Sequence, residues 1–477
     1  VATAMCTSVN AYTANLHLYQ NVIMPKKAKI ETTATGKKFK VVNPNAAGID
    51  IASSEMQVCV PENRGCDCNR TFGCFTQDLA QIADWLTSCH IETVAMESTG
   101  VYWLPLYFVL KERGFDVVLV NARDVKNYSG RKTDEADAEW LMMLHSYGLL
   151  KCSFQPENEA RAIRNLTRHR SNLLQSSSRE ALHMQKAMEQ MNLKLGNVIS
   201  DLLGKSGLAI IKAIIDGNHN PQELAMLAEY NCKASKDEIA KSLEGSWSED
   251  HLFELGQAYE LYNFIQKQIQ QCDKQIEMHL IRYRAELDPP SDGNMPRSKK
   301  KIGKKNAVDF DVEKYAFDIW KVNAMAIPGM SAISLLQLIG ELGHNFADKF
   351  DTCHSFCSWL NLVPNNKISG GKLLSSNVPK RTNTCGQVFR LCANSLKRNK
   401  TTLGYYFRRI QSRCGYSQAI VATAHKIAKI FFTMVKTHTE YDESKTGINE
   451  KALLERKILM TQRRLDKLNR QLEVSFA

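Results

Sequence analysis

The spacing of apolar and polar residues divides the chain into a first part that alternates between strands and helices and a second part that is helical. Within residues 41–150, short apolar runs with strand spacing lie between amphipathic helical runs. Strands are predicted in AGIDIASSEMQVCVP, IETVAME and DVVLVN, and helices in TQDLAQIADWLTSC and VYWLPLYFVLKERG. Strands that alternate with helices after an opening strand pair indicate an α/β domain with a mixed sheet.

The pattern becomes helical over residues 151–287. Apolar residues recur every seven positions and then at three-four spacing, at Leu174, Ala181, Met188 and Leu195 and again at Ala258, Tyr262, Ile265, Ile269 and Cys272. We predict a long helical hairpin or coiled coil that mediates self-association as a dimer or tetramer. A helical bundle packed only within one subunit fits the same spacing.

Composition separates the remaining segments. The run DPPSDGNMPRSKKKIGKKN is rich in Pro, Gly, Ser and Lys and predicts a basic linker over residues 288–311. A second compact, mainly α-helical domain is expected over 312–441, followed by a helix with heptad-like apolar spacing over 442–477. We expect 1–40 to be a disordered tail. MPKKAKIETTATGKKFK, which begins at Met24, resembles a natural protein start, so the 23 residues before it would be upstream reading-frame sequence.

Positive charge is concentrated in one stretch. The chain has 62 Lys and Arg against 50 Asp and Glu, a net charge of +12, yet residues 352–439 hold fourteen Lys or Arg and no Asp or Glu. A domain without carboxylates cannot offset its own repulsion, so we predict a nucleic-acid partner. The cations expected to contact it are Lys367, Lys372, Lys380, Arg381, Arg390, Lys397 and Arg398, together with Arg131 and Lys132.

The sequence argues against a membrane or secreted protein. No apolar run approaches the ~18 residues that a membrane-crossing helix needs, and no secretory signal is evident. The fourteen cysteines are scattered and predict reduced thiols. Cys59, Cys66, Cys68 and Cys74 cluster, but they lack the paired C-x-x-C spacing of a structural zinc site. We expect a cytoplasmic protein.

Four carboxylates occupy positions where α/β domains place functional residues. Asp50 lies inside the first strand, where burial without a partner is costly, and Glu97 ends a buried strand. Asp134 and Asp137 are three residues apart and therefore share one helix face. An acidic first turn favoured by the helix dipole is the alternative. We predict that the four hold one or two Mg²⁺ (or Mn²⁺) ions, which prefer oxygen ligands and act on phosphodiesters.

These motifs resemble those of a known family. The order Asp in GIDIA, Glu in MESTG and Asp-x-x-Asp in KTDEADA resembles the DEDD, RuvC-like domain of the insertion sequence 110 family of transposases. The similarity runs from Gly48 to Leu150 and resumes near Ile327, so it covers about half of the chain. It implies an RNase H-like (RuvC-like) fold for residues 41–150 and a requirement for a divalent metal.

The resemblance extends to a second motif. The run AIPGMSAISLLQLIGELG is similar to a helix-hairpin-helix, whose turn amides can meet a DNA phosphate. SWLNLVPNNKISGGKLLSSNVPKRTNTCGQVFRLCANSL resembles the family's second domain, although Asn361 replaces its usual glycine. In the family a serine of this segment is the nucleophile that attacks DNA, and Ser369 is the matching position. A simple Ser-Gly-Gly turn is the alternative, and Ser375 and Ser376 are rival nucleophiles.

The resemblance implies a DNA recombinase that moves an insertion sequence and is guided by an element-encoded structured RNA. It also implies a bacterial protein that associates with the nucleoid. Its catalytic residues would be the four acids and Ser369, and its partners donor and target DNA. The two centres are far apart in the sequence, so assembly across subunits is expected. Two alternatives stay open: a structure-specific metal nuclease with an inert serine, and a non-catalytic RNA-binding protein. A covalent protein–DNA adduct would separate the recombinase from both.

Overall fold

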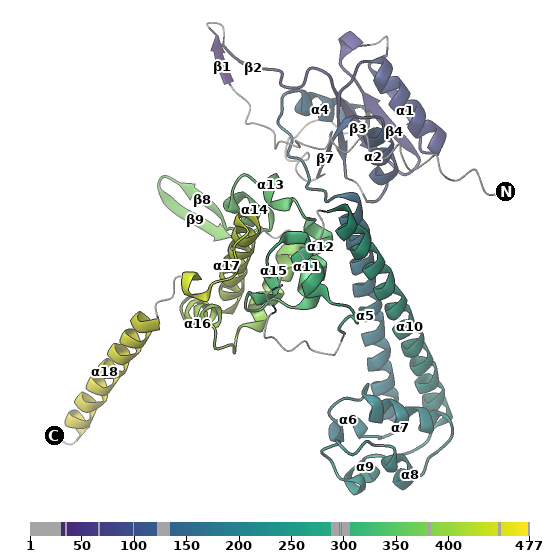
Figure 1. Cartoon of the computed structure of the whole chain (residues 1–477), viewed down its shortest axis with the longest axis vertical. Coiled ribbons are helices and arrows are strands. Elements are labelled where there is room, and N and C mark those ends of the chain that lie inside the picture. The colour runs from purple at the N-terminus through teal and green to yellow at the C-terminus, as the bar shows by residue number, and fades with distance from the viewer. Residues whose placement is uncertain are drawn as a thin grey trace. The chain divides into compact units, whose positions relative to one another are not determined.

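The computed structural model describes most of the chain, in two compact units. The described residues are 30–33, 36–64, 67–98, 100–121, 134–287, 295, 297, 306–379, 383–446 and 450–475. The first unit is Val1–Gln155 and the second is Pro156–Ala477, and each is described by itself (Figure 1). In these described ranges, no helix is both long enough and apolar enough to span a membrane.

The first unit is built on a five-stranded mixed sheet. The strands lie in the order β5 (Asn69–Gly73), β4 (Glu55–Cys59), β3 (Ala46–Ile51), β6 (Thr93–Glu97) and β7 (Asp116–Val120). β3, β4 and β5 are antiparallel, whereas β3, β6 and β7 are parallel. A short 3-10 turn, η1 (Glu62–Arg64), lies between β4 and β5. The predicted mixed α/β sheet is therefore confirmed.

Helices cover both faces of this sheet. Alternate β3 residues, Ala47 and Ile49 among them, point into an apolar core with α1 (Thr76–Ser88) and α2 (Trp103–Glu112). The opposite face packs on α4 (Asp134–Ser146), where Ala95 and Val120 contact Leu141 and Leu144. A strand buried on both faces carries few polar residues, so the acids of these strands are confined to the strand ends.

One sequence prediction for the first unit needs correction. Within the segment expected to be disordered, β1 (Ile30–Thr33) and β2 (Gly36–Phe39) form an antiparallel pair in which Ile30 lies opposite Phe39. The β-branched residues Ile30, Thr32 and Thr33 and the aromatic Phe39 favour strand conformation, and the charged residues around them obscured this signal. Residues 1–29, which include the rest of the predicted tail, lie outside the described residues.

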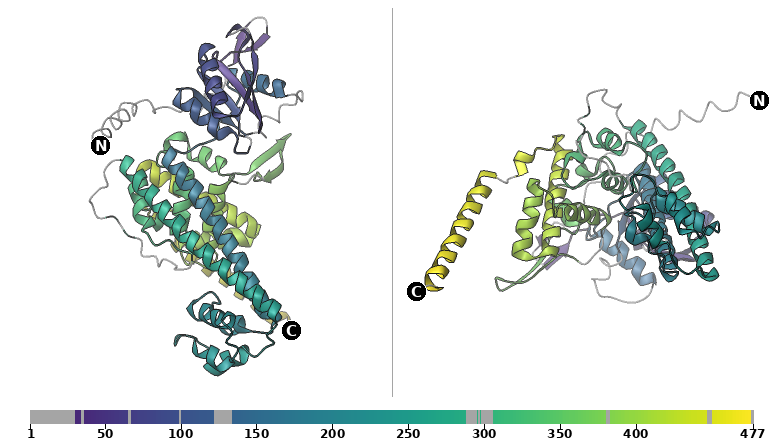
Figure 2. Two further views of the ribbon diagram at one scale, coloured as in Figure 1. Left: turned by 90° about the vertical axis from the view of Figure 1, so that its right-hand side faces the viewer. Right: turned by 90° about the horizontal axis from the view of Figure 1, so that it is seen from below.

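The second unit begins with a long helical hairpin. α5 (Asn158–Gln190) and α10 (Glu249–Glu286) lie side by side in Figures 1 and 2. Arg170, whose side chain is only 4% exposed, forms an ion pair of 2.5 Å with Asp273 across this pair. Short helices close the hairpin around an apolar core, namely α6 (Leu195–Val198), α7 (Lys205–Ile215), α8 (Pro221–Met226) and α9 (Lys236–Ser242). Contact between subunits through this hairpin stays a prediction.

The rest of the second unit is mainly helical, as its sequence pattern predicts. Aromatic rings form its centre. The ring centres of Trp320 and Phe431 lie 5.0 Å apart, and the ring of Phe346 stacks on that of Phe431 with a distance of 5.4 Å between centres. The elements are α11 (Val312–Trp320), η2 (Ala324–Ala326), α12 (Ala332–Leu342), α13 (Phe346–Lys349), α14 (Cys353–Trp359), β8 (Asn365–Ser369), β9 (Lys372–Asn377), α15 (Thr384–Ser395), α16 (Thr402–Cys414), α17 (Tyr416–Thr437), η3 (Glu443–Thr446) and α18 (Glu450–Ser475). Most of the predicted linker 288–311 lies outside the described residues.

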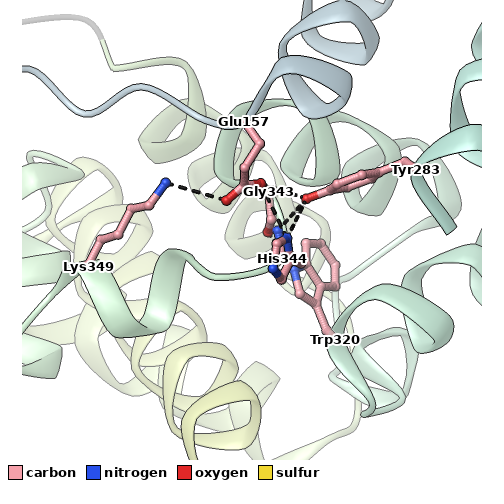
Figure 3. A network of polar contacts seen from close by, with 6 residues as sticks. All are labelled: Glu157, Tyr283, Trp320, Gly343, His344 and Lys349. Atoms are coloured by element: carbon pink, nitrogen blue, oxygen red, sulfur yellow. Dashed lines mark hydrogen bonds and ion pairs between the residues drawn. The ribbon is translucent and has the colours of Figure 1, made fainter. Parts of the chain in front are cut away.

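A polar network joins the hairpin to this helical domain. Glu157, which precedes α5, accepts a 2.8 Å hydrogen bond from the hydroxyl of Tyr283 in α10. The same carboxylate lies 3.4 Å from His344 Nδ1 and 3.4 Å from Lys349 Nζ (Figure 3). Trp320 donates to the carbonyl of Gly343 at 2.9 Å. The network therefore fixes both ends of the hairpin against the loop between α12 and α13.

Candidate functional site

The register of the sheet brings two of the predicted acids to one edge. β3 pairs in parallel with β6, with Ile49 opposite Met96. The next residue of each strand, Asp50 and Glu97, therefore lies at the same level of the sheet. Both are one residue removed from a side chain in the core shared with α1 and α2, so both point to the opposite face. Each is partly buried at the carboxyl end of its strand.

Helix α4 packs closely on that face because of a glycine. Gly48 lies two residues before Asp50, and a Cβ atom there would overlap the carbonyl oxygen of Ala138 and the backbone nitrogen of Met142. Any larger residue would displace the helix. Gly48 thus sets the distance between α4 and the strand that carries Asp50.

The direction of α4 is fixed by contacts at its C-terminal end. His145 Nε2 lies 2.8 Å from the hydroxyl of Thr93, the first residue of β6. The carbonyl of Ser146 accepts hydrogen bonds from the backbone N–H groups of Val42 and Asn43, just before β3. The C-terminus of α4 therefore lies at the amino ends of β3 and β6. Its N-terminus, with Asp134 and Asp137, points toward their carboxyl ends.

The geometry brings Asp50, Glu97 and the start of α4 to one edge of the sheet, but the described side chains do not form a complete metal site. Asp137 is exposed, whereas the side chain of Asp134 lies outside the described residues. Across the described part of the chain, no group of three or more His, Cys, Asp or Glu residues is placed to hold a metal ion. Arg131 and Lys132 also lie outside it. A metal site formed by all four acids therefore stays a prediction. What supports it is that Asp50, Glu97 and the start of α4 lie at the same edge of the sheet.

Ser369 lies at the tip of a two-stranded hairpin formed by β8 and β9. It ends β8 and pairs with Lys372 across the Gly370–Gly371 turn. These glycines have φ angles of 55° and 74°, as a turn with two left-handed residues requires, and no atom lies within 4 Å of either ideal Cβ position. Ser369 is exposed, and so are Lys367 and Lys372. A DNA backbone can approach the serine without side-chain obstruction at the turn.

The two rival serines have different surroundings. Ser376 donates a 2.8 Å hydrogen bond to the side-chain oxygen of Asn366. Ser375 lies opposite Lys367 in the register of the hairpin and is partly buried. Both lie toward the far end of β9, whereas Ser369 directly adjoins the turn.

The five remaining cations predicted to bind nucleic acid fall into three groups. Lys397 and Arg398 are exposed just beyond α15. Arg390 is half-buried, and its guanidinium donates to the carbonyl of Asn361 at 2.6 Å, so it has a structural task. Burial lowers the pKa of Arg390. Lys380 and Arg381 lie outside the described residues.

Sequence reasoning missed an aromatic component of this basic surface. Three tyrosines of α16 and α17 each have a cation over the ring, at 4.7 to 5.4 Å, namely Tyr405, Tyr406 and Tyr416. The letters YYFRR, in a stretch without carboxylates, were the available signal.

Comparisons with known proteins agree with the fold and these motifs. A family model for the DEDD domain of insertion sequence 110 transposases matches residues 47–193, and a model described as "Transposase IS116/IS110/IS902 family" matches residues 323–400. A "Probable family 20 transposase" of Pseudomonas aeruginosa is 24% identical over 414 residues, which are 84% of this chain and 99% of that protein. The sheet, its acidic edge and these matches define a transposase. The chain belongs to the insertion sequence 110 family.

Proposed function

We propose that this transposase is a DNA recombinase that cuts and rejoins donor and target DNA to move an insertion sequence. Ser369 would be the nucleophile, and Asp50, Glu97, Asp134 and Asp137 would form a divalent-metal site. The observation that carries the proposal is the sheet register, in which Asp50 and Glu97 share the edge toward which α4 presents its acidic N-terminus.

The residues of this edge suit Mg²⁺ or Mn²⁺. The donor set is made of carboxylate oxygens, which hard divalent cations prefer. A metal bound there would stabilise negative charge on the oxygens of a phosphodiester. The chain itself positions the carboxylates, because Gly48 allows the close approach of α4 and His145 holds its far end to Thr93.

The covalent step would conserve the phosphodiester bond energy. Ser369 Oγ gives up its proton and attacks the phosphorus, and one bridging oxygen of the DNA leaves, taking up a proton as a free hydroxyl. Attack of a DNA hydroxyl on the phosphoserine then releases the serine and rejoins the strand. Lys367 and Lys372, exposed on the same hairpin, could balance charge on the attacked phosphate.

A structured guide RNA and self-assembly complete the proposal. The segment without carboxylates offers positive charge for nucleic acid. Protein contacts would hold backbones and duplex shape, while pairing with the RNA would read the sequence. The long α5–α10 hairpin would provide the contact between subunits of a dimer or tetramer.

The test is detection of a covalent intermediate. The protein is incubated with its RNA, Mg²⁺ and labelled DNA, then run on a denaturing gel under conditions that block rejoining. A slow-migrating adduct is expected, which Ser369→Ala abolishes while Ser375→Ala and Ser376→Ala retain it. Peptide mapping should locate the DNA on Ser369. Free DNA ends with no adduct in any variant would instead identify a hydrolytic metal nuclease.

The acidic site is tested with isosteric amides. Asp50→Asn, Glu97→Gln and Asp137→Asn should each abolish the adduct while leaving RNA binding intact. Glu92→Gln is the matched control, because Glu92 is exposed at the opposite end of the strand that Glu97 terminates. Full activity in the three variants would show that the acids are structural.

A further inference from the structure

A group of tyrosines and cations gathers where α15, α16 and α17 meet. Arg408 lies 4.7 Å from the ring centre of Tyr405, within α16. Lys397, just beyond α15, lies 5.2 Å from the ring centre of Tyr416, at the start of α17. Tyr405 and Tyr416 are 37% and 41% exposed. Each ring therefore carries a cation on its surface and is still open to a ligand.

Neighbouring contacts hold these rings in place. The hydroxyl of Tyr416 donates to the side-chain oxygen of Asn394 at 2.5 Å, and its ring meets Phe407 edge-on at 6.0 Å. Arg408 donates to the carbonyls of Lys397 and Asn399 at 3.2 and 2.7 Å. Because these side chains are already held, stacking of a ligand on the rings would cost little side-chain conformational entropy of the protein.

Exposed positive charge continues along α16. Tyr405, Arg409 and Arg413 recur at four-residue steps and are all exposed, so they form one stripe on the helix. Arg409 and Lys426 lie 5.4 and 4.8 Å from the ring centre of Tyr406.

Like charges crowd one another at this place. The pKa of Lys426 is lowered by burial first and then by the positive charges of Arg409 and Lys429. The surrounding segment, residues 352–439, contains no Asp or Glu of its own. A bound anion would relieve this repulsion.

Aromatic rings beside a line of cations suit one kind of ligand. Bases that are not paired stack on aromatic side chains while their phosphates meet the cations. A duplex offers phosphates, but its base faces are already stacked on each other. An acidic peptide would satisfy the cations without using the rings.

We propose that the tyrosine–arginine face, made of Lys397, Tyr405, Arg409, Arg413, Tyr416 and Lys426, binds an unpaired nucleic-acid strand. The inference deepens the proposed function, on which it rests for nucleic acid as the partner. α16 and α17 lie after residue 400, where the family match to this domain ends.

The test measures binding of the full-length protein by fluorescence anisotropy. The probes are oligothymidylate and oligouridylate of roughly 20 nucleotides and a duplex of the same length. Tyr405→Leu keeps an apolar side chain without an aromatic face. It should weaken binding of the unpaired strands roughly 5- to 150-fold, as expected for the loss of one stacked base, and change duplex binding less than about 2-fold. Tyr405→Phe should bind as the unchanged protein does.

The controls separate stacking from charge. Tyr230→Leu replaces a tyrosine that is 99% exposed in the connection between α8 and α9, and it should leave every affinity unchanged. Arg409→Gln combined with Arg413→Gln should weaken unpaired and duplex probes alike. Preference for oligouridylate over oligothymidylate would assign the strand to RNA, and the reverse to DNA.

The failures of the two proposals are distinguishable. Equal effects of Tyr405→Leu on unpaired and duplex probes, or no effect on either, would overturn base stacking while leaving the proposed function intact. If the unchanged protein bound none of the probes at low salt, nucleic acid would be excluded as the partner and both proposals would fall.

Discussion

The hydroxyl of Tyr283 donates a hydrogen bond of 2.8 Å to Glu157, although the two residues are 126 positions apart in the sequence. Burial, and after it the charge of Glu157, raises the pKa of Tyr283 far above its ordinary value, so the phenol keeps its proton and remains the donor. The carboxylate also faces His344 and Lys349 (Figure 3). The stability of the junction therefore depends on the charge of one side chain.

Glu157 should make stability sensitive to acid. Burial opposes its ionisation, but hydrogen bonds from His344 and Tyr283 and the charges of Lys349 and His344 outweigh burial and lower its pKa from 4.5 to about 2. A depressed carboxyl pKa contributes stability that is present above about 4.5 and lost as the pH falls toward 2. Glu157→Gln should cost about 1–3 kcal/mol at neutral pH, and this difference should shrink in acid.

Urea unfolding followed by circular dichroism measures that effect. Glu189→Gln near the C-terminal end of α5 is the control, because the ion pair of Glu189 with Lys194 is exposed and contributes little. A Glu157→Gln penalty that stays constant down to pH ~3 would show that the side chain acts by shape and not by charge.

His145 should produce a second pH dependence, in the first unit. Burial lowers its pKa from 6.5 to about 4, although the charge of Asp116 opposes this shift. The unfolded chain then binds a proton that the folded chain excludes, so stability is full above about 6.5 and declines as the pH falls toward 4. His145→Gln should remove this slope, which is at most ~1.4 kcal/mol per pH unit. The exposed His183→Gln should retain it, and an unchanged slope in His145→Gln would contradict the assignment.

Gly48→Ala should separate α4 from the sheet. The new methyl group would overlap the backbone of Ala138 and Met142, and overpacking of this kind costs about 1–3 kcal/mol. We expect lower thermal stability in calorimetry and loss of recombination, because Asp137 moves with the helix. Gly256→Ala on α10 is the control, since its nearest neighbour is Ile215 Cγ2 at 3.7 Å. Normal recombination by Gly48→Ala would mean that the position of α4 does not matter.

DNA binding should depend steeply on salt. Contacts to six to ten phosphates would reduce affinity roughly 10³- to 10⁵-fold between about 50 and 200 mM salt. Lys367→Gln combined with Lys372→Gln should reduce the slope of log affinity against log salt by about 2. Lys241→Gln combined with Lys267→Gln, at exposed positions of α9 and of the middle of α10, should leave this slope unchanged. A shallow slope in the unchanged protein would show that its positive charge faces something other than DNA.

Local patterns predicted the elements better than their contacts. The alternation in GIDIA and the apolar run in IETVAME were sufficient to predict β3 and β6, because burial of alternate residues leaves a direct trace in the sequence. The same text predicted acids at strand ends. It could not predict that the guanidinium of Arg390 donates to the carbonyl of Asn361. A long charged side chain can equally well extend into solvent, and the sequence does not distinguish the two positions.

Contacts between distant segments left no readable pattern. Glu157 and Tyr283 each have ordinary neighbours in the sequence, and only the antiparallel course of α5 and α10 brings them together. The cation–aromatic pair of Lys397 and Tyr416 is a similar case, because Lys397 follows α15 and Tyr416 begins α17. The strand pair β1–β2 was missed for a local reason, the density of lysines around it.

The junction at Glu157 and Tyr283 has a consequence for how this chain can vary. Everything between these residues departs from and returns to one place, so the hairpin is an excursion of the chain at the start of the second unit. Adding or removing whole turns in both α5 and α10 would leave the junction and the aromatic centre around Trp320 unchanged. The reach of the hairpin is thus a quantity that mutation can adjust independently of the domain that carries Ser369.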